Sequence, residues 1–152
     1  HTSCSQADGT YTLNGLGPYK WPVEFPDFSG KHAWVWSGNA PDRFAATPVA
    51  VRAGRSTTAN VTLPLGGKLT GTVVGATLPN QWITVYATNT RTGDIAGPRG
   101  VVTGAAQYTL TGLATQQIWV YYNGGPGDLI RYPEAVAVTA GQTKHLDLPE
   151  PS

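Results

Sequence analysis

Apolar and polar residues alternate in many short runs along this chain of 152 residues, and Gly, Pro and Asn residues separate the runs. Between positions 68 and 74, Leu69 and Val73 fall on one face, whereas Thr70 and Thr72 fall on the other. Such alternation is typical of a β-strand, because successive side chains of a strand point to opposite sides. No stretch longer than about two helical turns repeats its apolar residues every 3.6 positions. The pattern therefore predicts an all-β protein.

The alternating runs define the strands that we expect in each half of the sequence. In the first half they predict strands at 10–13, 19–25, 32–36, 48–52 and 58–63. In the second half they predict seven strands, at 68–74, 82–87, 101–103, 107–110, 117–122, 135–139 and 144–148. Pro22 has no N–H group, so the run 19–25 should lie at a sheet edge or contain a bulge there.

Three short motifs occur twice, in the same order. The first is Tyr-Thr-Leu-Asn-Gly-Leu at 11–16, which returns as Tyr-Thr-Leu-Thr-Gly-Leu at 108–113. The second is Val-Ala-Val-Arg-Ala-Gly at 49–54, which returns as Val-Ala-Val-Thr-Ala-Gly at 136–141. The third is Val-Thr-Leu-Pro at 61–64, which returns as Leu-Asp-Leu-Pro at 146–149. A fixed order of related blocks indicates one ancestral unit used twice. We therefore expect two tandem small β-sandwiches, with residues 1–65 forming a truncated unit and residues 66–152 forming a complete seven-stranded unit.

The two expected units differ in length before the first shared motif. Residues 66–107, a stretch of 42, precede Tyr108, whereas ten residues precede Tyr11. The first unit should therefore lack roughly three strands. Two interpretations stay open: the chain begins inside a domain whose remainder packs on the second unit, or an open groove accepts a strand from a partner. In the second case the apolar residues that a partner would cover are Tyr11, Leu13, Leu16, Val49 and Val51.

Composition limits the classes of partner and the compartment. Charged residues make up 12% of the sequence, and the net charge is +1, so the basic face that nucleic acid requires is lacking. No apolar run approaches the ~18–20 residues of a membrane span. The absence of Met, with abundant Trp and Tyr, favours a secreted protein, in which His1 would follow a cleavage or a tag. Cys4 is the only cysteine, so no disulfide can form within the chain. Three interpretations stay open: Cys4 lies in a flexible end without a role, it forms an intermolecular disulfide, or it is a free thiol.

The repeated blocks, together with Gly-Lys-Leu-Thr-Gly-Thr-Val at 67–73 and Trp-Ile-Thr-Val-Tyr at 82–86, resemble the carboxypeptidase regulatory-like domain. This family is a transthyretin-like (prealbumin-like) β-sandwich that occurs in tandem in secreted proteins, especially of actinobacteria, and is related to Cna-B stalk domains. The likeness covers nearly all of 66–149 and the first copy from Gly9 onward. The family usually has Asp-x-x-Gly-x-Tyr at the tyrosine motif. Asp8-Gly9-Thr10-Tyr11 fits with a shortened gap, whereas 105–108 has lost the acid and the Gly.

The resemblance implies a spacer, stalk or binding role without catalysis, and the residues agree with that expectation. His1, His32 and His145 form no metal-binding motif, and no nucleophile elbow or phosphate-binding loop occurs, so we expect no enzyme activity, metal or cofactor. The Cna-B relatives can form isopeptide crosslinks, and Lys68 and Asp147 lie in the opening and closing strands of the second unit. Alternation points both side chains outward, which disfavours a crosslink without deciding the question.

The aromatic residues of the first half support a second hypothesis. Trp side chains flanked by amide and carboxylate groups can hold a sugar ring, although most Trp residues in small sandwiches are buried. The carbohydrate-binding candidates are Tyr19, Trp21, Trp34, Trp36, Asn39, Asp42 and Arg43. In the second half, Trp119 and Tyr121 point away from Ile118 and Val120, so an exposed pair there would mark an interface.

The leading hypothesis is a secreted, non-enzymatic structural or adaptor module that docks another secreted protein or a cell-surface component. The alternative is a carbohydrate-binding module that uses the Trp cluster. Nucleic acid is not expected as a partner, and self-association is left open.

Overall fold

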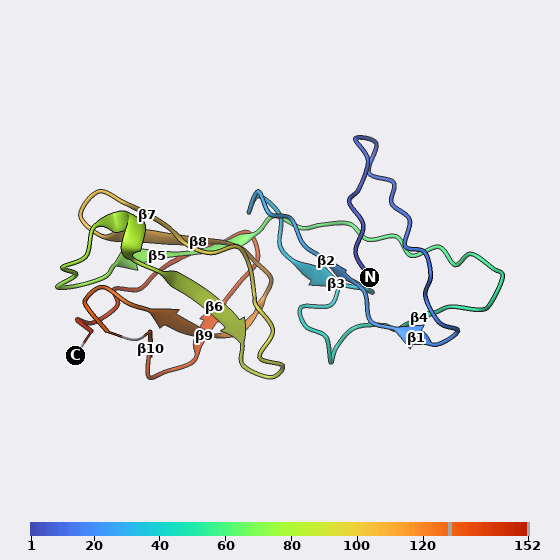
Figure 1. Cartoon of the computed structure of the whole chain (residues 1–152). Coiled ribbons are helices and arrows are strands. Elements are labelled where there is room, and N and C mark those ends of the chain that lie inside the picture. Colours follow the sequence, from blue (N-terminus) through green and yellow to red (C-terminus); the bar gives the residue numbers. More distant parts are fainter. Residues whose placement is uncertain (128, 152) are drawn as a thin grey trace.

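The structure, a computed structural model, describes residues 1–127 and 129–151. Within this part the chain is all-β, as predicted, with one short 3₁₀ helix, η1 (Asn80–Trp82), and several small sheets (Figure 1).

The second half has the character of a β-sandwich. One sheet has the order β12-β5-β8-β7, formed by β5 (Gly67–Thr72), β7 (Val101–Thr103), β8 (Gln107–Leu113) and β12 (Thr143–His145). Strand β12 runs parallel to β5, and the other pairs are antiparallel. In the other sheet, β9 (Gln116–Tyr122) pairs on one edge with β6 (Val85–Asn89) and on the opposite edge with β10 (Ile130–Arg131) and β11 (Val136–Val138).

Side chains from both sheets fill a common core, because alternate residues of each strand point inward. Leu69 and Val73 come from the first sheet, and Ile83, Val85 and Ala87, which the alternation placed inward, are also buried. The core is completed mainly by Tyr108, Leu110, Leu113, Ile118, Val120, Tyr122, Val136, Val138 and Leu148. The prediction that Leu69 and Val73 share one face of their strand is confirmed, because both are buried in this core.

The first half contains much less regular structure than its sequence predicts. Its strands are β1 (Lys20–Trp21), β2 (Glu24–Phe25), β3 (Val35–Trp36) and β4 (Val49–Ala50), each two residues long. Strand β1 pairs only with β4, and β2 pairs only with β3. The predicted run 19–25 is interrupted at Pro22, which has no N–H group for a ladder.

Several predicted boundaries are wrong. In the described residues, 10–13 and 58–63 are not strands, because neither segment has a neighbour that completes a ladder. The run 82–87 begins as η1, so strand β6 starts only at Val85. Strand β10, which follows a Gly-rich turn, was not predicted, and β8 continues past the expected end to Leu113.

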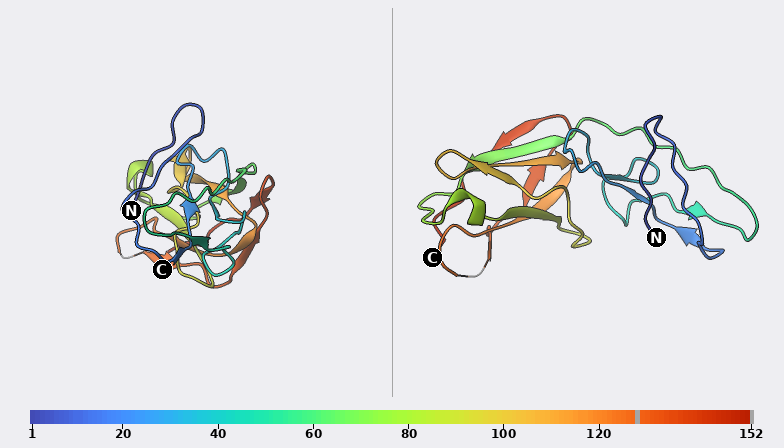
Figure 2. Two further views of the ribbon diagram at one scale, coloured as in Figure 1. Left: turned by 90° about the vertical axis from the view of Figure 1, so that its right-hand side faces the viewer. Right: turned by 45° about the horizontal axis from the view of Figure 1, so that its top comes forward.

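The two halves lie end to end and touch at one junction (Figures 1 and 2). A small apolar cluster joins them: Ala33 and Val35 of the first half and Ala114 of the second are buried, and Phe25, Val61, Leu63 and Ala140 pack against these three. The amide of Trp34 also donates to the carbonyl of Gly112 at 2.9 Å. The far end of the first half extends away from the sandwich (Figure 2).

Candidate functional site

The segment 57–63 has unpaired backbone N–H groups, whereas two of its carbonyls, those of Ala59 and Thr62, accept side-chain hydrogen bonds. It contains no turn or bend, and Ala59, Val61 and Leu63 are half-buried while the residues between them are exposed. Within the described residues, no backbone N–H of 57–63 donates to a backbone carbonyl. A strand-like segment with a row of unpaired N–H groups is a template for pairing with another chain.

The tyrosine of the repeated motif makes the same kind of hydrogen bond in both halves. The hydroxyl of Tyr108 donates to the carbonyl of Leu146 at 2.5 Å, and that of Tyr11 donates to the carbonyl of Ala59 at 2.5 Å. Leu146 directly follows β12, which pairs with β5. In each half, the motif tyrosine therefore binds a carbonyl of a segment near the C-terminal end of that half.

The two halves differ in whether a strand pairs with the segment that accepts the tyrosine hydrogen bond. In the second half Gly71 of β5 is the register partner of Tyr108, and the amides of Leu146 and Leu148 donate to carbonyls of β5 residues Thr70 and Thr72 at 2.8 Å. Within the described part of the first half, no strand pairs with 57–63. The chain from 10 to 17 crosses this segment instead of running along it (Figures 1 and 2).

A groove of about 350 Å³ opens beside this segment. Phe25 and Val49 are the largest apolar residues of its lining, which also includes Ser37 and Gly38. Its sides are formed by residues 47–50 and 57–60. The repeated sequence motif aligns Val49 of the groove with Val136, which is a buried core residue of the second half.

The five residues expected to meet a partner are only partly brought together. All five are half-buried, and Val49 alone lines the groove. Tyr11 packs its ring edge-to-face on Phe25 at 5.5 Å, and the amide of Val51 donates to the carbonyl of Tyr19. The sequence missed the backbone of 57–63, although the alternation at 58–63 was a signal for it.

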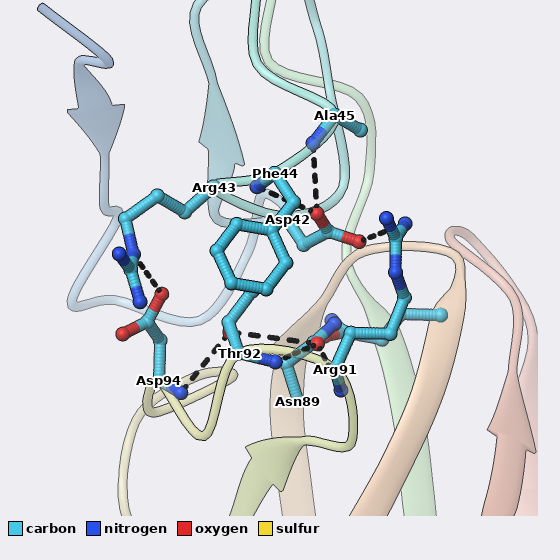
Figure 3. A network of polar contacts seen from close by, with 9 residues as sticks. Asp42, Arg43, Phe44, Ala45, Asn89, Arg91, Thr92 and Asp94 are labelled. Carbon is cyan, nitrogen blue, oxygen red and sulfur yellow. Dashed lines mark hydrogen bonds and ion pairs between the residues drawn. The ribbon is translucent and has the colours of Figure 1, made fainter.

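Two ion pairs fix the junction between the halves (Figure 3). The buried carboxylate of Asp42 accepts the amides of Phe44 and Ala45 at 2.9 Å and pairs with the guanidinium of Arg91 at 3.0 Å. Arg43 pairs with Asp94 at 3.0 Å, and both of these side chains are more exposed than Asp42. We call these four charged side chains the junction clamp.

The loop that carries Arg91 and Asp94 is ordered by Asn89 at the end of β6. The side-chain oxygen of Asn89 accepts the amides of Arg91 and Thr92, and its side-chain nitrogen donates to Gln116 at 2.9 Å. The alternation in the sequence predicts no strand between 87 and 101 and gives no structure for this loop. An Asn at the start of a turn is a signal for such side-chain capping, but the pairing with Asp42 has no local signal.

Trp34, Trp36, Glu24, Asp42 and Asp94 share a small cleft at the junction. Its free space is about 10 Å³, roughly that of a single water. Burial, with a smaller contribution from the Asp94 carboxylate, raises the pKa of Glu24 to about 7.

The carbohydrate-binding candidates therefore fall into separate places. Trp34, Trp36, Asp42 and Arg43 meet at the junction, where the indole N–H of Trp34 already donates to the carbonyl of Asp27. Three candidates lie elsewhere: Tyr19 and Trp21 pack on each other at 6.1 Å, and Asn39, in a left-handed turn conformation, donates to the carbonyl of Thr62.

We expect Glu24→Gln to stabilise the protein at pH 8 and to leave its stability at pH 4 nearly unchanged. The folded protein holds the Glu24 proton up to about pH 7, whereas a free Glu loses it near 4.5. Rising pH between these values therefore lowers the free energy of unfolding, by about 1–2 kcal/mol after discounting for solvent access. Urea unfolding of both proteins across pH 4–8 measures the effect. Parallel pH profiles for the two proteins would contradict it.

Cys4 is exposed and unpaired in the structure, and its pairing with another chain stays a prediction. Lys68 and Asp147 do not meet. Lys68 pairs in register with Thr143, whereas the carboxylate of Asp147 accepts the amide of Thr72 at 2.8 Å. Four residues of strand, about 13 Å, separate the two positions along β5, so no isopeptide bond can join them in this conformation.

The outer face of β6 and β9 carries aromatic residues, as the alternation predicted for Trp119 and Tyr121. Tyr121 stacks on Tyr86 at 5.1 Å, and the guanidinium of Arg131 covers the ring of Trp119 at 4.2 Å. All three rings are half-buried. Each of these cross-strand contacts covers one face of the ring.

In residues 1–127 and 129–151, no group of three or more His, Cys, Asp or Glu side chains is placed to hold a metal ion. The same part of the chain contains no helix that is long and apolar enough to cross a membrane. Comparison of the sequence and the structure with protein-family models, curated proteins and solved structures finds no match.

Proposed function

We propose that this chain is a secreted, non-enzymatic adaptor module that docks a protein partner by accepting a β-strand along segment 57–63. The single observation that carries the proposal is the row of unpaired backbone N–H groups of this segment beside the 350 Å³ groove. Strand addition uses main-chain hydrogen bonds for affinity and side-chain pockets for specificity, and both are provided here.

The proposal includes a tandem architecture of two transthyretin-like units, and in the described residues of the first unit no strand pairs with 57–63. The shared tyrosine–carbonyl hydrogen bond supports it, because it links the same two motifs in each half. The junction clamp suits an adaptor, since it holds the groove in a defined orientation relative to the sandwich.

The carbohydrate-binding alternative has weaker support. Trp34 and Trp36 do share a cleft with Asp42, but about 10 Å³ of space would not admit a sugar ring unless the junction opened. We therefore place the binding role in the groove and not at the Trp cluster.

Strand acceptance can be tested with displayed random ten-residue peptides selected on the intact protein. In the second half, the amides of Leu146 and Leu148 face β5, and these residues correspond to odd-numbered positions of 57–63. Ala59→Pro, which deletes one such amide, should weaken the selected peptides at least tenfold. Thr62→Pro deletes an amide of the other edge, at a residue that does not line the groove, and should leave the affinity of these peptides unchanged. Equal losses in both variants, or no selected binder, would refute the proposed function.

A further inference from the structure

The second half of the chain shows which kind of strand fits beside segment 57–63. We infer that the partner strand has the sequence pattern of residues 67–73, Gly-x-Leu-x-Gly-x-Val, and that it runs parallel to 57–63. This inference rests on the proposed function and specifies the partner: a protein that presents a strand of the type that opens the second unit.

The direction follows from the pairing of β12 with β5. These strands are parallel, with Thr143 opposite Lys68 and His145 opposite Thr70. The hydrogen bonds continue past β12, where Leu146 and Leu148 donate to Thr70 and Thr72. In the proposed architecture 57–63 corresponds to the β12 region, so a strand that copies β5 must copy its direction.

The register is constrained by two ways of aligning the halves. The sequence motif Val-Thr-Leu-Pro aligns 61 with 146, an offset of 85, whereas the tyrosine hydrogen bond aligns Ala59 with Leu146, an offset of 87. The offsets differ by two residues. A shift of two in a strand keeps the same residues on the same edge and face. In both alignments, Ala59 and Val61 therefore have the orientation of the β12 residues that face β5.

The glycine is required by the tyrosine hydrogen bond. A Cβ added at Gly71 would lie 1.9 Å from the carbonyl oxygen of Leu146, the oxygen that accepts the Tyr108 hydroxyl. In the first half the Tyr11 hydroxyl holds the carbonyl of Ala59 in the same way. A partner strand that passes over this carbonyl must therefore have glycine at the position of contact. In the pattern of residues 67–73, an apolar residue lies two positions before this glycine and another lies two positions after it.

The apolar positions of the pattern match the groove. In the second half, Leu69 and Val73 lie on either side of Gly71 and are buried against the opposite sheet. In the first half the corresponding space is bordered by Phe25 and Val49. A Leu and a Val from the incoming strand would cover these residues, which removes apolar surface from water.

A second copy of this chain is a less suitable donor. Its own Gly67–Thr72 strand is β5, which is paired on both edges, with β8 and with β12. Lending it would expose Leu69 and disrupt the buried core. Among separate chains, the suitable donor is therefore a different protein whose strand of this pattern is free.

The test uses fluorescein-labelled peptides and the intact protein, read by anisotropy. The peptide Gly-Lys-Leu-Thr-Gly-Thr-Val-Val, the sequence of 67–74, should bind saturably. The same peptide with Val at its second Gly, and the peptide in reversed sequence, should each bind at least tenfold more weakly. Equal binding of all three peptides would overturn the inference, and no binding of the first would contradict docking between separate chains.

A fused version keeps the test decisive if the free peptide binds weakly. The eight residues are joined before His1 through a flexible Gly/Ser linker, which raises the effective concentration to about the millimolar range. The fused peptide should raise the melting temperature, and its Gly→Val version should not. Equal melting temperatures of the two fusions would overturn the inference.

The outcomes separate this inference from the proposed function. Selected peptides that need the Ala59 amide but lack the Gly-x-Leu-x-Gly-x-Val pattern would leave strand acceptance standing and refute the pattern. A peptide that stabilises only when fused would support the pattern and contradict docking between separate chains. Dimerisation that the free peptide prevents would identify a second copy as the occupant and overturn the choice of partner.

Discussion

Gly71→Ala is expected to destabilise the protein by about 3 kcal/mol or to prevent folding of the second half. The new Cβ would lie 1.9 Å from the carbonyl oxygen and 2.6 Å from the carbonyl carbon of Leu146. Both are backbone atoms, so no side-chain rotation relieves the clash. The chain after β12 must move, and the hydrogen bond from the Tyr108 hydroxyl is lost with it.

Gly125→Ala is the matched control, because the nearest atom to its Cβ is the hydroxyl oxygen of Thr77 at 3.7 Å, an ordinary contact. Urea unfolding followed by tryptophan fluorescence measures both variants. If Gly71→Ala were as stable as Gly125→Ala, the close approach of β5 to Leu146 would be wrong, and with it the basis for a glycine in the partner strand.

Asp42→Ala is expected to loosen the junction and to lower the free energy of unfolding by about 2–4 kcal/mol. The substitution leaves the amides of Phe44 and Ala45 without their acceptor and Arg91 without its partner. Because the carboxylate of Asp42 is only 4% exposed, water replaces these contacts poorly, although the 60% exposure of Arg91 limits the cost on that side.

Arg43→Ala provides the comparison, since it removes the exposed ion pair of the same clamp. Such pairs contribute about 0–1 kcal/mol, so this variant should remain close to the parent in stability. Limited proteolysis should cut Asp42→Ala between the halves sooner than Arg43→Ala. Equal proteolysis and equal stability would show that the buried carboxylate does not fix the junction.

The sequence predicted the second half well because its strands find their partners within the chain. The predicted strand 101–103 is observed with the same bounds, and Leu69, Val73, Ile83 and Val85 are buried as the alternation requires. The first half was predicted poorly because alternation indicates which residues suit a strand, not whether a neighbour is present. Segment 58–63 alternates as clearly as many strands of the second half, yet no ladder forms on it in the described residues.

The junction could not be predicted for a different reason. Asp42 and Arg91 lie 49 positions apart, and neither has a local feature that selects the other. The raised pKa of Glu24 likewise depends on burial at a surface between two halves, which composition and periodicity do not reveal. By contrast, the repeated tyrosine motif was visible in the sequence, and its meaning became specific only with the two hydroxyl–carbonyl hydrogen bonds.

The most direct test of strand acceptance is amide hydrogen exchange of residues 57–63, measured by NMR with and without saturating peptide of the sequence 67–74. In the free protein all seven amides should exchange rapidly, because none donates to a backbone carbonyl. With the peptide, the amides of Ala59 and Val61 should slow at least tenfold, whereas those of Thr58, Asn60 and Thr62 should stay fast. Amides that are already slow in the free monomer, or that do not change with peptide, would contradict the account.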